Sequence, residues 1–519
     1  MNVQSRYAVM IASMVSLGGF LFGFDASVIA GVVPFIIPEF GLDDIQVGIV
    51  VSAPTAAGIV AGLSAGPISD YVGRRKVLIA LAALYTISAV CSAIAPNFET
   101  LVFARFIGGF AFASLSIAPM YIAEIAPSKR RGQLVSFNQF NIVIGFSAAY
   151  FANYFFLIQS QSDAGWVQAL GIDQHTWRWM LGLEALPAAI WLAVLLYVPE
   201  SPRWLGLNGR IEEARAVLAR LRPADRIEKT LADIRSSVSE SGHSFWVRLK
   251  ALAAPSLRLP IAIGIVVGIA QQVTGVNAIF FYSTRIFEQS GVGTNAAFAQ
   301  AVVVGIVNVV FTIAAMLLID RLGRRPLLIG GLVGVILSTS LAGYGFSQAR
   351  YELTSESVAT LSETIDIAEL EPLIGVEFAN DVGFKRAAAD VLGANVVRDN
   401  QATLIQAAIH VNPYVILAGI LGFVASFAIS LGPVMWVLFS EIFPNRIRGI
   451  AMAFVGVFNS ISSYLVQLLF PWEVSNLGSA TTFFIYSGLG VIGLVLLSWM
   501  LPETKGKSLE ELEEAFGER

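Results

Sequence analysis

The sequence predicts an all-α polytopic membrane protein with twelve transmembrane helices in two six-helix bundles. Three observations support this fold class. Of 519 residues, 56% are hydrophobic and only 13% are charged, whereas soluble domains carry about 25% charged residues. Apolar runs of about 20 residues, long enough to cross a bilayer, recur along the whole chain. Two charged motifs also occur once in each half, which indicates a tandem repeat of about six spans.

The twelve apolar runs are bounded by Gly, Pro or charged residues. They begin near residues 8, 47, 77, 101, 133, 177, 258, 296, 325, 413, 449 and 480. The first run lacks a small-residue cleavage pattern, so we expect a retained helix and not a signal peptide. The stretch from 201 to 256 instead shows apolar residues at helical spacing among paired charges, which predicts short amphipathic helices.

Charge placement predicts the orientation of the chain. The basic segments "GRRK", "SKRRG", "GRRP" and "NRIRG" fall in alternate loops, which the positive-inside rule assigns to the cytoplasm. We therefore expect both termini to be cytoplasmic, and a bacterial protein of this kind to lie in the inner membrane. Cys91 is the only cysteine, so it supports no internal disulfide.

The internal repeat locates an insertion. Asp70 opens "DYVGRRK" and Asp320 opens "DRLGRRP", 250 residues apart, whereas "AEIAPSKRRG" and "SEIFPNRIRG" are 317 residues apart at their glutamates. The second half thus carries 67 extra residues between its third and fourth spans, on the extracytoplasmic side. We expect an N-terminal bundle, amphipathic helices, a C-terminal bundle with an acidic loop or small cap, and a cytoplasmic tail, at 1–200, 201–256, 257–501 with the insertion at about 350–410, and 502–519.

Several motifs together resemble the sugar porters of the major facilitator superfamily. They are "DYVGRRK", "RFIGGFAFASLSIAPMYIAEIAP", "PESPRWL", "QQVTGVNAIFFYS", "DRLGRRP", "GPVMWVLFSEIFPNRIRG" and "LPETKGKSLEEL". The resemblance runs nearly end to end, apart from the insertion. It implies two bundles around a central sugar site that opens alternately to each side, in a family that contains both proton symporters and passive facilitators.

Polar side chains inside the spans are candidate sugar ligands. A polyol offers hydroxyls that donate and accept and apolar ring faces, so amides and an aromatic ring suit it. By resemblance, the sugar-contacting positions are Gln139, Gln271, Gln272, Asn277, Asn308, Trp436 and Asn459. The alternative is that these amides only bond neighbouring helices.

The seventh span poses a geometric problem. Gln271 and Asn277 are six residues apart, so on a straight helix they point roughly 120° away from each other. Gly275 between them offers a place for the helix to bend or unwind. We therefore expect a break there.

Three positions leave the identity of the transported sugar undetermined. Phe146, Phe281 and Ser460 stand where a proton-coupled pentose symporter of the family has Gln, Tyr and Trp. Each change alters hydrogen bonding or ring stacking in the expected pocket. The sequence predicts a pentose or hexose without choosing between them.

A second set of charged residues lies in the cytoplasmic loops of both repeats. Their arginines are expected to help orient the chain in the membrane. The family resemblance implies in addition an ion-pair network that closes the cytoplasmic side in the outward-open state. The set comprises Asp70, Arg74, Glu124, Arg131, Asp320, Arg324, Glu441 and Arg448.

Asp25 lies deep in the first apolar run, where a charge is costly unless it is paired or protonated. Arg105 begins the fourth span, so it either snorkels to the interface or pairs inside. By resemblance, an aspartate and an arginine at these positions mark proton symporters, whereas facilitators have an uncharged residue at the first. We therefore favour symport over passive facilitation.

Other function classes fit less well. No phosphate-binding loop, zinc-protease motif or nucleophile elbow occurs, so we expect neither an enzyme nor a metal or other cofactor. A sugar sensor that binds without transporting stays an alternative. The expected partners are a monosaccharide, protons and the lipid bilayer, with no nucleic acid and a functional monomer.

Overall fold

The computed structural model describes residues 3–127, 130–240, 250, 252–359, 361, 365, 367–444 and 447–505. Within this part, twelve helices are long and apolar enough to cross a membrane, and all twelve predicted spans are confirmed. They are Arg6–Phe40, Asp44–Val72, Arg74–Ala93, Phe98–Ile125, Arg131–Ser160, Thr176–Leu195, Arg258–Phe281, Thr294–Ile319, Arg324–Ser347, Pro413–Ile442, Arg448–Leu477 and Ser479–Met500.

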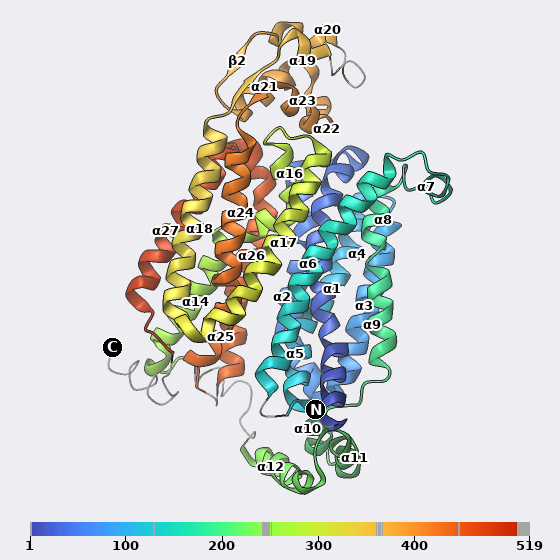
Figure 1. The fold of residues 1–519 in the computed structure, drawn as a ribbon, viewed down its shortest axis with the longest axis vertical. Coiled ribbons are helices and arrows are strands. Elements are labelled where there is room, and N and C mark those ends of the chain that lie inside the picture. Colours follow the sequence, from blue (N-terminus) through green and yellow to red (C-terminus); the bar gives the residue numbers. More distant parts are fainter. Residues whose placement is uncertain are drawn as a thin grey trace.

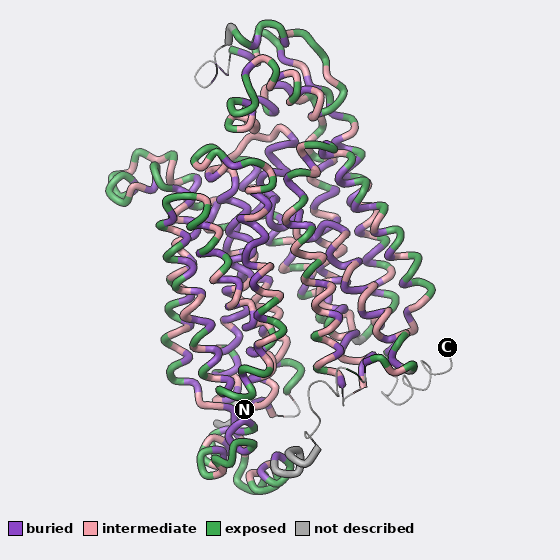
Figure 2. Tube along the Cα trace, turned by 180° about the vertical axis from the view of Figure 1, so that it is seen from behind, coloured by how far each residue is buried: buried purple, intermediate pink, exposed green. Residues whose placement is uncertain are grey.

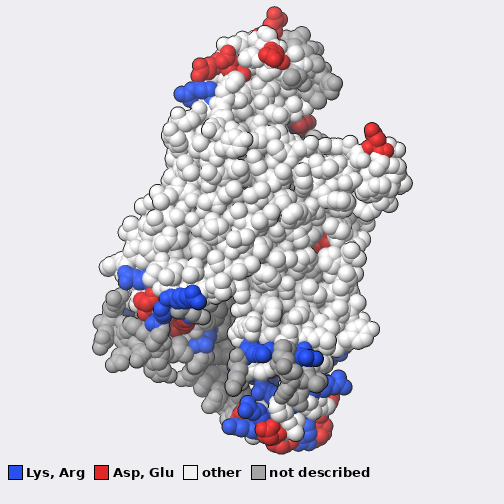
Figure 3. Space-filling view, viewed as in Figure 1, with Lys and Arg blue, Asp and Glu red and all other residues white. Residues whose placement is uncertain are grey.

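The protein is a multi-pass membrane protein of two adjacent helical bundles (Figure 1). Figure 3 shows charged side chains gathered at the two ends, with an almost uncharged band between them. Such a band matches the hydrocarbon core, where charges are costly. The first transmembrane helix begins and the last one ends at the same end of the molecule (Figure 1).

The first bundle, which we call the N-terminal half, contains several helices that are continuous and several that are broken. Its elements are α1 (Val3–Phe40), α2 (Asp44–Val72), α3 (Arg74–Ala93), α4 (Phe98–Phe110), η1 (Ala111–Ala113), α5 (Ser114–Ile125), α6 (Arg131–Ser160), α7 (Gly165–Ala169), α8 (Thr176–Gly182) and α9 (Ala185–Leu195). Its helices α1 and α6 touch backbone to backbone. A Cβ atom added at Gly23 would lie 2.0 Å from the Ile142 carbonyl oxygen, and one at Gly145 would lie 2.1 Å from the Phe20 carbonyl oxygen.

The second bundle, the C-terminal half, repeats this arrangement with a broken first helix. It contains α14 (Arg258–Val273), α15 (Val276–Phe281), α16 (Ser283–Glu288), α17 (Thr294–Leu322), α18 (Arg324–Ser347), α24 (Pro413–Ile429), α25 (Leu431–Ile442), α26 (Arg448–Leu477) and α27 (Ser479–Met500). Between the halves lie the short helices that the charge pattern predicts. They are α10 (Pro202–Leu207), α11 (Ile211–Leu221), η3 (Ala224–Arg226), α12 (Ile227–Glu240) and η4 (Pro255–Leu257).

The repeat extends to the ends of the bundles. Glu200 accepts a hydrogen bond from the Arg75 backbone N–H (3.0 Å), at the start of α3. Glu503 accepts from the Arg324 and Arg325 backbone N–H groups (both 3.2 Å), at the start of α18. A carboxylate therefore caps the equivalent helix in each half, where the helix dipole favours negative charge.

The insertion folds into a small cap at the end opposite the termini (Figure 1). Its sheet has the order β2-β1-β3, antiparallel throughout, with Tyr351 opposite Phe378 and Ile409. The elements are β1 (Arg350–Glu352), α19 (Ser355–Ala359), α20 (Ile367–Leu370), η5 (Glu371–Leu373), β2 (Glu377–Phe378), α21 (Asp381–Leu392), α22 (Ala394–Asp399), α23 (Gln401–Ala408) and β3 (Ile409–His410).

The cap has its own buried core, visible in Figure 2, in which Tyr351, Phe384 and Leu404 take part. It rests on both halves: α22 lies against α1, whereas α23 lies against α16 and α21 against α26. Its buried Asp381 pairs with Lys385 (2.9 Å) and accepts a hydrogen bond from Ser479 Oγ (3.4 Å) at the start of α27.

The two halves are joined toward the cap end. One continuous hydrophobic core contains Val28 and Val51 of the N-terminal half together with Phe280 and Val466 of the C-terminal half. The part of the N-terminal half nearer the termini, around Tyr121, forms a separate core. In Figure 1 the bundles diverge toward the end that carries the termini. The protein is therefore closed on the cap side.

Candidate functional site

Asp25 and Arg105 meet inside the N-terminal half. Their side chains are 8% and 3% exposed, and Arg105 Nη1 donates to Asp25 Oδ1 at 3.2 Å. Arg105 Nε also donates to the Val50 carbonyl oxygen (3.0 Å). The arginine is therefore held in the interior by α1 and α2, so snorkelling to the interface is wrong for this structure.

A third ionisable group belongs to this site and was missed in the sequence. Glu184 is buried at the start of α9 and lies close enough to Asp25 and Arg105 to interact with both charges. It is the only charged residue between Arg178 and Glu200 in an otherwise apolar stretch. The same signal that singles out Asp25, a lone carboxylate in a membrane span, points to Glu184 as well.

Four of the predicted sugar ligands come together in the C-terminal half. Asn459 Nδ2 donates to Gln271 Oε1 (2.7 Å) and to the Gly268 carbonyl oxygen (2.9 Å). Gln272 Nε2 donates to Gln271 Oε1 (3.1 Å), and Asn277 Nδ2 donates to Gln272 Oε1 (2.8 Å). We call Gln271, Gln272, Asn277 and Asn459 the amide cluster.

The predicted helix break makes this cluster possible. Helix α14 ends at Val273 and α15 begins at Val276, with Gly275 between them in the left-handed region at φ +93°. A side chain there is strained by the backbone and would meet the Tyr486 ring, 2.4 Å from an added Cβ. The break turns Asn277 back toward Gln272, which a straight helix would not do.

The other predicted sugar ligands lie outside the amide cluster. Asn308 is buried in α17 and Gln139 is half-buried in α6. Trp436 of α25 is 45% exposed, with its ring edge-on to Phe439. Its neighbour Met435 contacts Asn459 (3.8 Å from Sδ to Nδ2), so α25 adjoins the cluster. No hydrogen bond joins these three side chains to the cluster in the described residues.

Phe146 and Phe281 are two of the three positions that leave the identity of the sugar undetermined. Phe146 of α6 packs against Phe280 across the two halves, with ring centroids 5.1 Å apart. Phe281 is buried in α15, next to the helix break. Apolar rings therefore occupy both positions.

The charged residues of the repeated loop motifs pair within each half. Arg74 Nη2 contacts Asp70 (2.6 Å) and Glu124 (3.3 Å), and Arg324 Nη2 contacts Glu441 (2.7 Å). Arg131 is exposed, and Arg448 Nε donates to the Phe443 carbonyl oxygen (3.2 Å). The side chain of Asp320 lies outside the described part. In the described residues, none of these pairs joins one half to the other.

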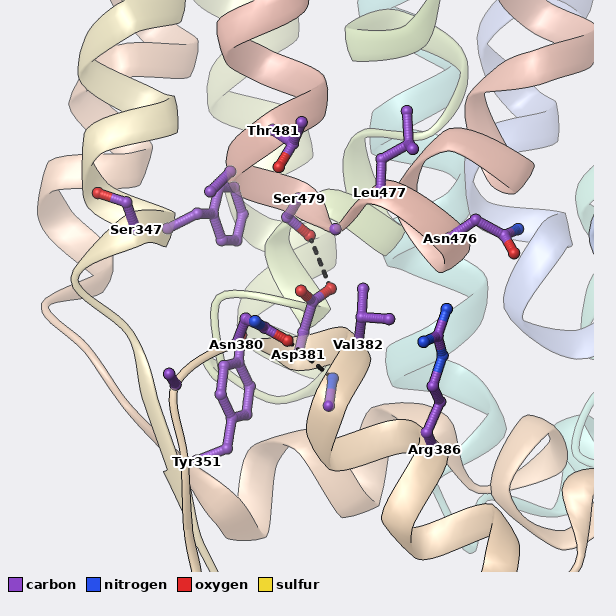
Figure 4. A pocket seen from close by; sticks show the side chains of 15 residues that line it. Ser347, Tyr351, Asn380, Asp381, Val382, Arg386, Asn476, Leu477, Ser479 and Thr481 are labelled. Atoms are coloured by element: carbon purple, nitrogen blue, oxygen red, sulfur yellow. Dashed lines mark hydrogen bonds between the residues drawn. The ribbon is translucent and has the colours of Figure 1, made fainter.

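A cavity of about 420 Å³ lies elsewhere, between the cap and the α26–α27 junction (Figure 4). Asp381 and Ser479, which share a hydrogen bond, line it, and Arg386 extends toward Asn476. None of the predicted sugar ligands lines it. Its walls belong to the cap and the C-terminal half, so this cavity lies apart from the contact between the halves.

Comparison with known proteins identifies the family. A family described as "Sugar (and other) transporter" matches residues 11–361 and 388–516, so the unmatched segment falls inside the cap. An arabinose-proton symporter of Bacillus subtilis is 33% identical and is aligned over 98% of this chain and 95% of its own length. A D-xylose-proton symporter of Escherichia coli is 32% identical, over 99% of this chain and 97% of its own.

A solved structure agrees in fold. The xylose transporter XylE from E. coli, in an inward-open conformation, superposes with a TM-score of 0.73 at 30% identity, covering 98% of this chain and all of XylE. That conformation matches the closed cap side described above. The chain belongs to the sugar porter family of the major facilitator superfamily.

Proposed function

We propose that this protein imports a monosaccharide, a pentose or hexose, by proton symport through alternating access. The observation that carries the proposal is the buried Asp25–Arg105 pair, because an ionisable group inside a membrane span is costly and can bind and release a proton, which a passive sugar path does not require. The similarity to proton-coupled arabinose and xylose symporters supports it. The transported sugar stays open, since relatives of similar identity include a glucose transporter of Staphylococcus epidermidis.

The charges around Asp25 suggest how a proton would be bound. Two carboxyl groups, Asp25 and Glu184, face a single guanidinium, Arg105. With both carboxyls ionised, the buried group would carry one net negative charge, which is costly in a membrane. Binding of one proton balances the charge and weakens the hold on Arg105. Loss of that proton on the cytoplasmic side would restore the pair.

The amide cluster supplies the proposed sugar site. Its amides bond one another in this structure, so they hold donors and acceptors ready for sugar hydroxyls. Gln139, Asn308 and Trp436 would complete the site from α6, α17 and α25 once sugar is bound. Trp436 offers an exposed ring face on the wall next to Asn459.

The cytoplasmic charges would form the gate of the opposite state. In the cap-side-closed structure they pair within each half. We propose that Asp70, Arg74, Glu124 and Arg131 exchange partners with Asp320, Arg324, Glu441 and Arg448 when the cytoplasmic side closes. The pairs that involve Asp70 and Glu441 are partly exposed and are worth little individually. Arg74 and Glu124 are buried, so their exchange requires a replacement partner in the other half. The termini would then be cytoplasmic, and the monomer in a bacterial inner membrane would be the working unit.

The test compares two activities of the Asp25→Asn variant in the same proteoliposomes. Sugar-for-sugar exchange needs no net proton movement and should persist, whereas uphill accumulation under an imposed proton gradient should disappear. Asp43→Asn, an exposed carboxylate in the loop before α2, is the matched control. Accumulation that survives in Asp25→Asn and is abolished by a protonophore would refute Asp25 as the coupling residue. Binding without filling of the vesicles would indicate a sensor.

A further inference from the structure

Helices α2 and α26 form one of the contacts between the halves, and their backbones approach very closely. A Cβ atom added at Gly48 would lie 2.1 Å from the Leu468 carbonyl oxygen. About two turns deeper in the membrane, Thr55 Oγ1 of the N-terminal half donates to Gln467 Oε1 of the C-terminal half at 2.9 Å. Gln467 is 1% exposed and Thr55 is half-buried, so this bond is partly shielded from water.

This bond is the last in a continuous series that begins at the amide cluster. Asn277 Nδ2 donates both to Gln272 Oε1 (2.8 Å) and to Ser463 Oγ (2.5 Å). Gln467 Nε2 in turn donates to the same Ser463 Oγ (2.8 Å), which fixes the amide so that its oxygen faces Thr55. The Ser463 hydroxyl oxygen therefore links the amide cluster to the hydrogen bond between the halves.

Other contacts close the same side but do not touch the cluster. Tyr150 donates to the Phe280 carbonyl oxygen, Thr284 donates to the Ala30 carbonyl oxygen, and Arg285 pairs with Asp44 (3.1 Å). All of them must separate before the cap side opens. Among the described contacts between the halves, Thr55–Gln467 is the one joined to the amide cluster through side-chain hydrogen bonds.

We propose that Ser463, Gln467 and Thr55 are positioning residues that report sugar occupancy to the contact between the halves. The inference rests on the proposed function, because it takes the amide cluster as the sugar site. A sugar hydroxyl that accepts from Asn277 takes that donor away from Ser463. The Ser463 hydroxyl is then free to reorient, the Gln467 amide loses its fixed orientation, and Thr55 loses its acceptor. Bound sugar thus weakens closure of the cap side.

The test follows opening of the cap side through one engineered thiol. In a Cys91→Ser background, Ser283→Cys places a thiol in α16, where the side chain is fully buried next to the contact between the halves. The rate of labelling by an externally added, membrane-impermeant maleimide then reports opening. The probes are L-arabinose, D-glucose and D-xylose, each also measured for direct binding to the same purified protein.

Three variants separate the steps of the series. Thr55→Val should raise the sugar-free labelling rate about fivefold, the factor expected for loss of one neutral hydrogen bond, and Thr55→Ser should restore it. Ser463→Ala removes the acceptor that fixes the Gln467 amide, so it should raise the sugar-free labelling rate toward that of Thr55→Val and abolish the further increase on adding sugar. Thr86→Val is the matched control, because the Thr86 hydroxyl bonds only the Ala82 carbonyl oxygen of its own helix.

Three results would overturn the inference, and they are distinguishable. If a sugar binds the parent protein and Ser463→Ala still shows the full sugar-dependent increase in labelling, the series transmits nothing, although the proposed function stands. If none of the three sugars binds the parent protein, the sugar site and this inference both fail. Unchanged sugar-free labelling in Thr55→Val would show that the Thr55–Gln467 bond does not hold the cap side closed.

Discussion

The two halves arise from one repeat but place their polar groups differently. The N-terminal half holds ionisable groups at its centre, Asp25, Glu184 and Arg105. The C-terminal half holds neutral amides at its centre, and its buried charges Arg285 and Glu288 lie at its outer edge, in α16. On the proposed function, the proton site and the sugar site therefore lie in different halves, so that relative movement of the halves can link proton binding to sugar binding.

The helices differ in the same sense. The N-terminal half seals α1 against α6 by direct backbone contact, whereas the corresponding helix of the C-terminal half is broken at Gly275. A buried charge needs a fixed partner, because an unpaired ion in the membrane is costly. A sugar site instead needs amides that can exchange partners. On the proposed function, the rigid α1–α6 contact holds the charged site in place, whereas the broken helix at Gly275 lets the amides exchange partners with a sugar.

The largest expected effect comes from breaking the charged centre. Arg105→Met leaves Asp25 and Glu184 without a cation and should lower the free energy of unfolding by about 3–5 kcal/mol. The equivalent change at the neutral centre, Gln271→Met, should cost only about 1–3 kcal/mol. Denaturant unfolding in detergent measures both. Partial recovery in the double variant Asp25→Asn/Arg105→Met is expected, and equal losses in the single and double variants would contradict the buried-charge explanation.

The outer edge of the C-terminal half should respond to pH. Burial raises the pKa of Glu288 to about 7, opposed by a hydrogen bond from Thr294 and the charge of Arg285. Glu288 lines a small cavity together with Arg285 and with Arg398 and Asp399 of the cap. Between about pH 4.5 and pH 7 the folded protein binds a proton that the unfolded chain releases. The free energy of unfolding should therefore fall as pH rises through this window, by up to about 3 kcal/mol.

Glu288→Gln tests this dependence. The variant should be more stable than the parent protein at pH 8 and nearly equal to it at pH 5, since glutamine cannot ionise. The exposed Glu99→Gln serves as control. A parent protein whose thermal unfolding does not change over pH 5–8 would contradict the prediction.

The amide cluster should give a smaller effect that is confined to the sugar. Gln272→Ala and Asn277→Ala should each weaken sugar binding by about 1–3 kcal/mol, with protein abundance and the number of protons moved per sugar unchanged. Equilibrium binding to purified protein measures the first quantity. Asn476→Ala, an exposed amide at the outer end of the same bundle, is the control. Normal binding by both variants would remove these residues from the site.

Removing the cap should have the smallest effect on transport. Deletion of about residues 352–402 leaves both bundles and the contacts between their helices intact, so uptake into vesicles should stay measurable. The cap contacts α1, α16 and α26, and its loss is expected to alter the rate and not the presence of uptake. A deletion variant that reaches the membrane in normal amounts but transports nothing would place the cap in the mechanism.

Hydropathy predicts the spans because each helix must bury about 20 residues in hydrocarbon whatever its neighbours are. The break at Gly275 is also local, since it follows from two amides at unsuitable spacing around a glycine. The burial of Arg105 was open in the sequence, because it depends on how α1 and α2 pack around it. The cap's short strands and helices carry no comparable periodic signal, and their arrangement depends on contacts far apart in the sequence.

The backbone contact between α1 and α6 has a consequence for local opening. At Gly23 and Gly145 no side chain separates the helices, so water can reach the intervening amides only if the two helices part completely. Protection against hydrogen–deuterium exchange follows the free energy of such openings. The amides of α1 and α6 should therefore exchange on the slowest timescale in the protein, and those around Gly275, where the helix is already interrupted, on a much faster one.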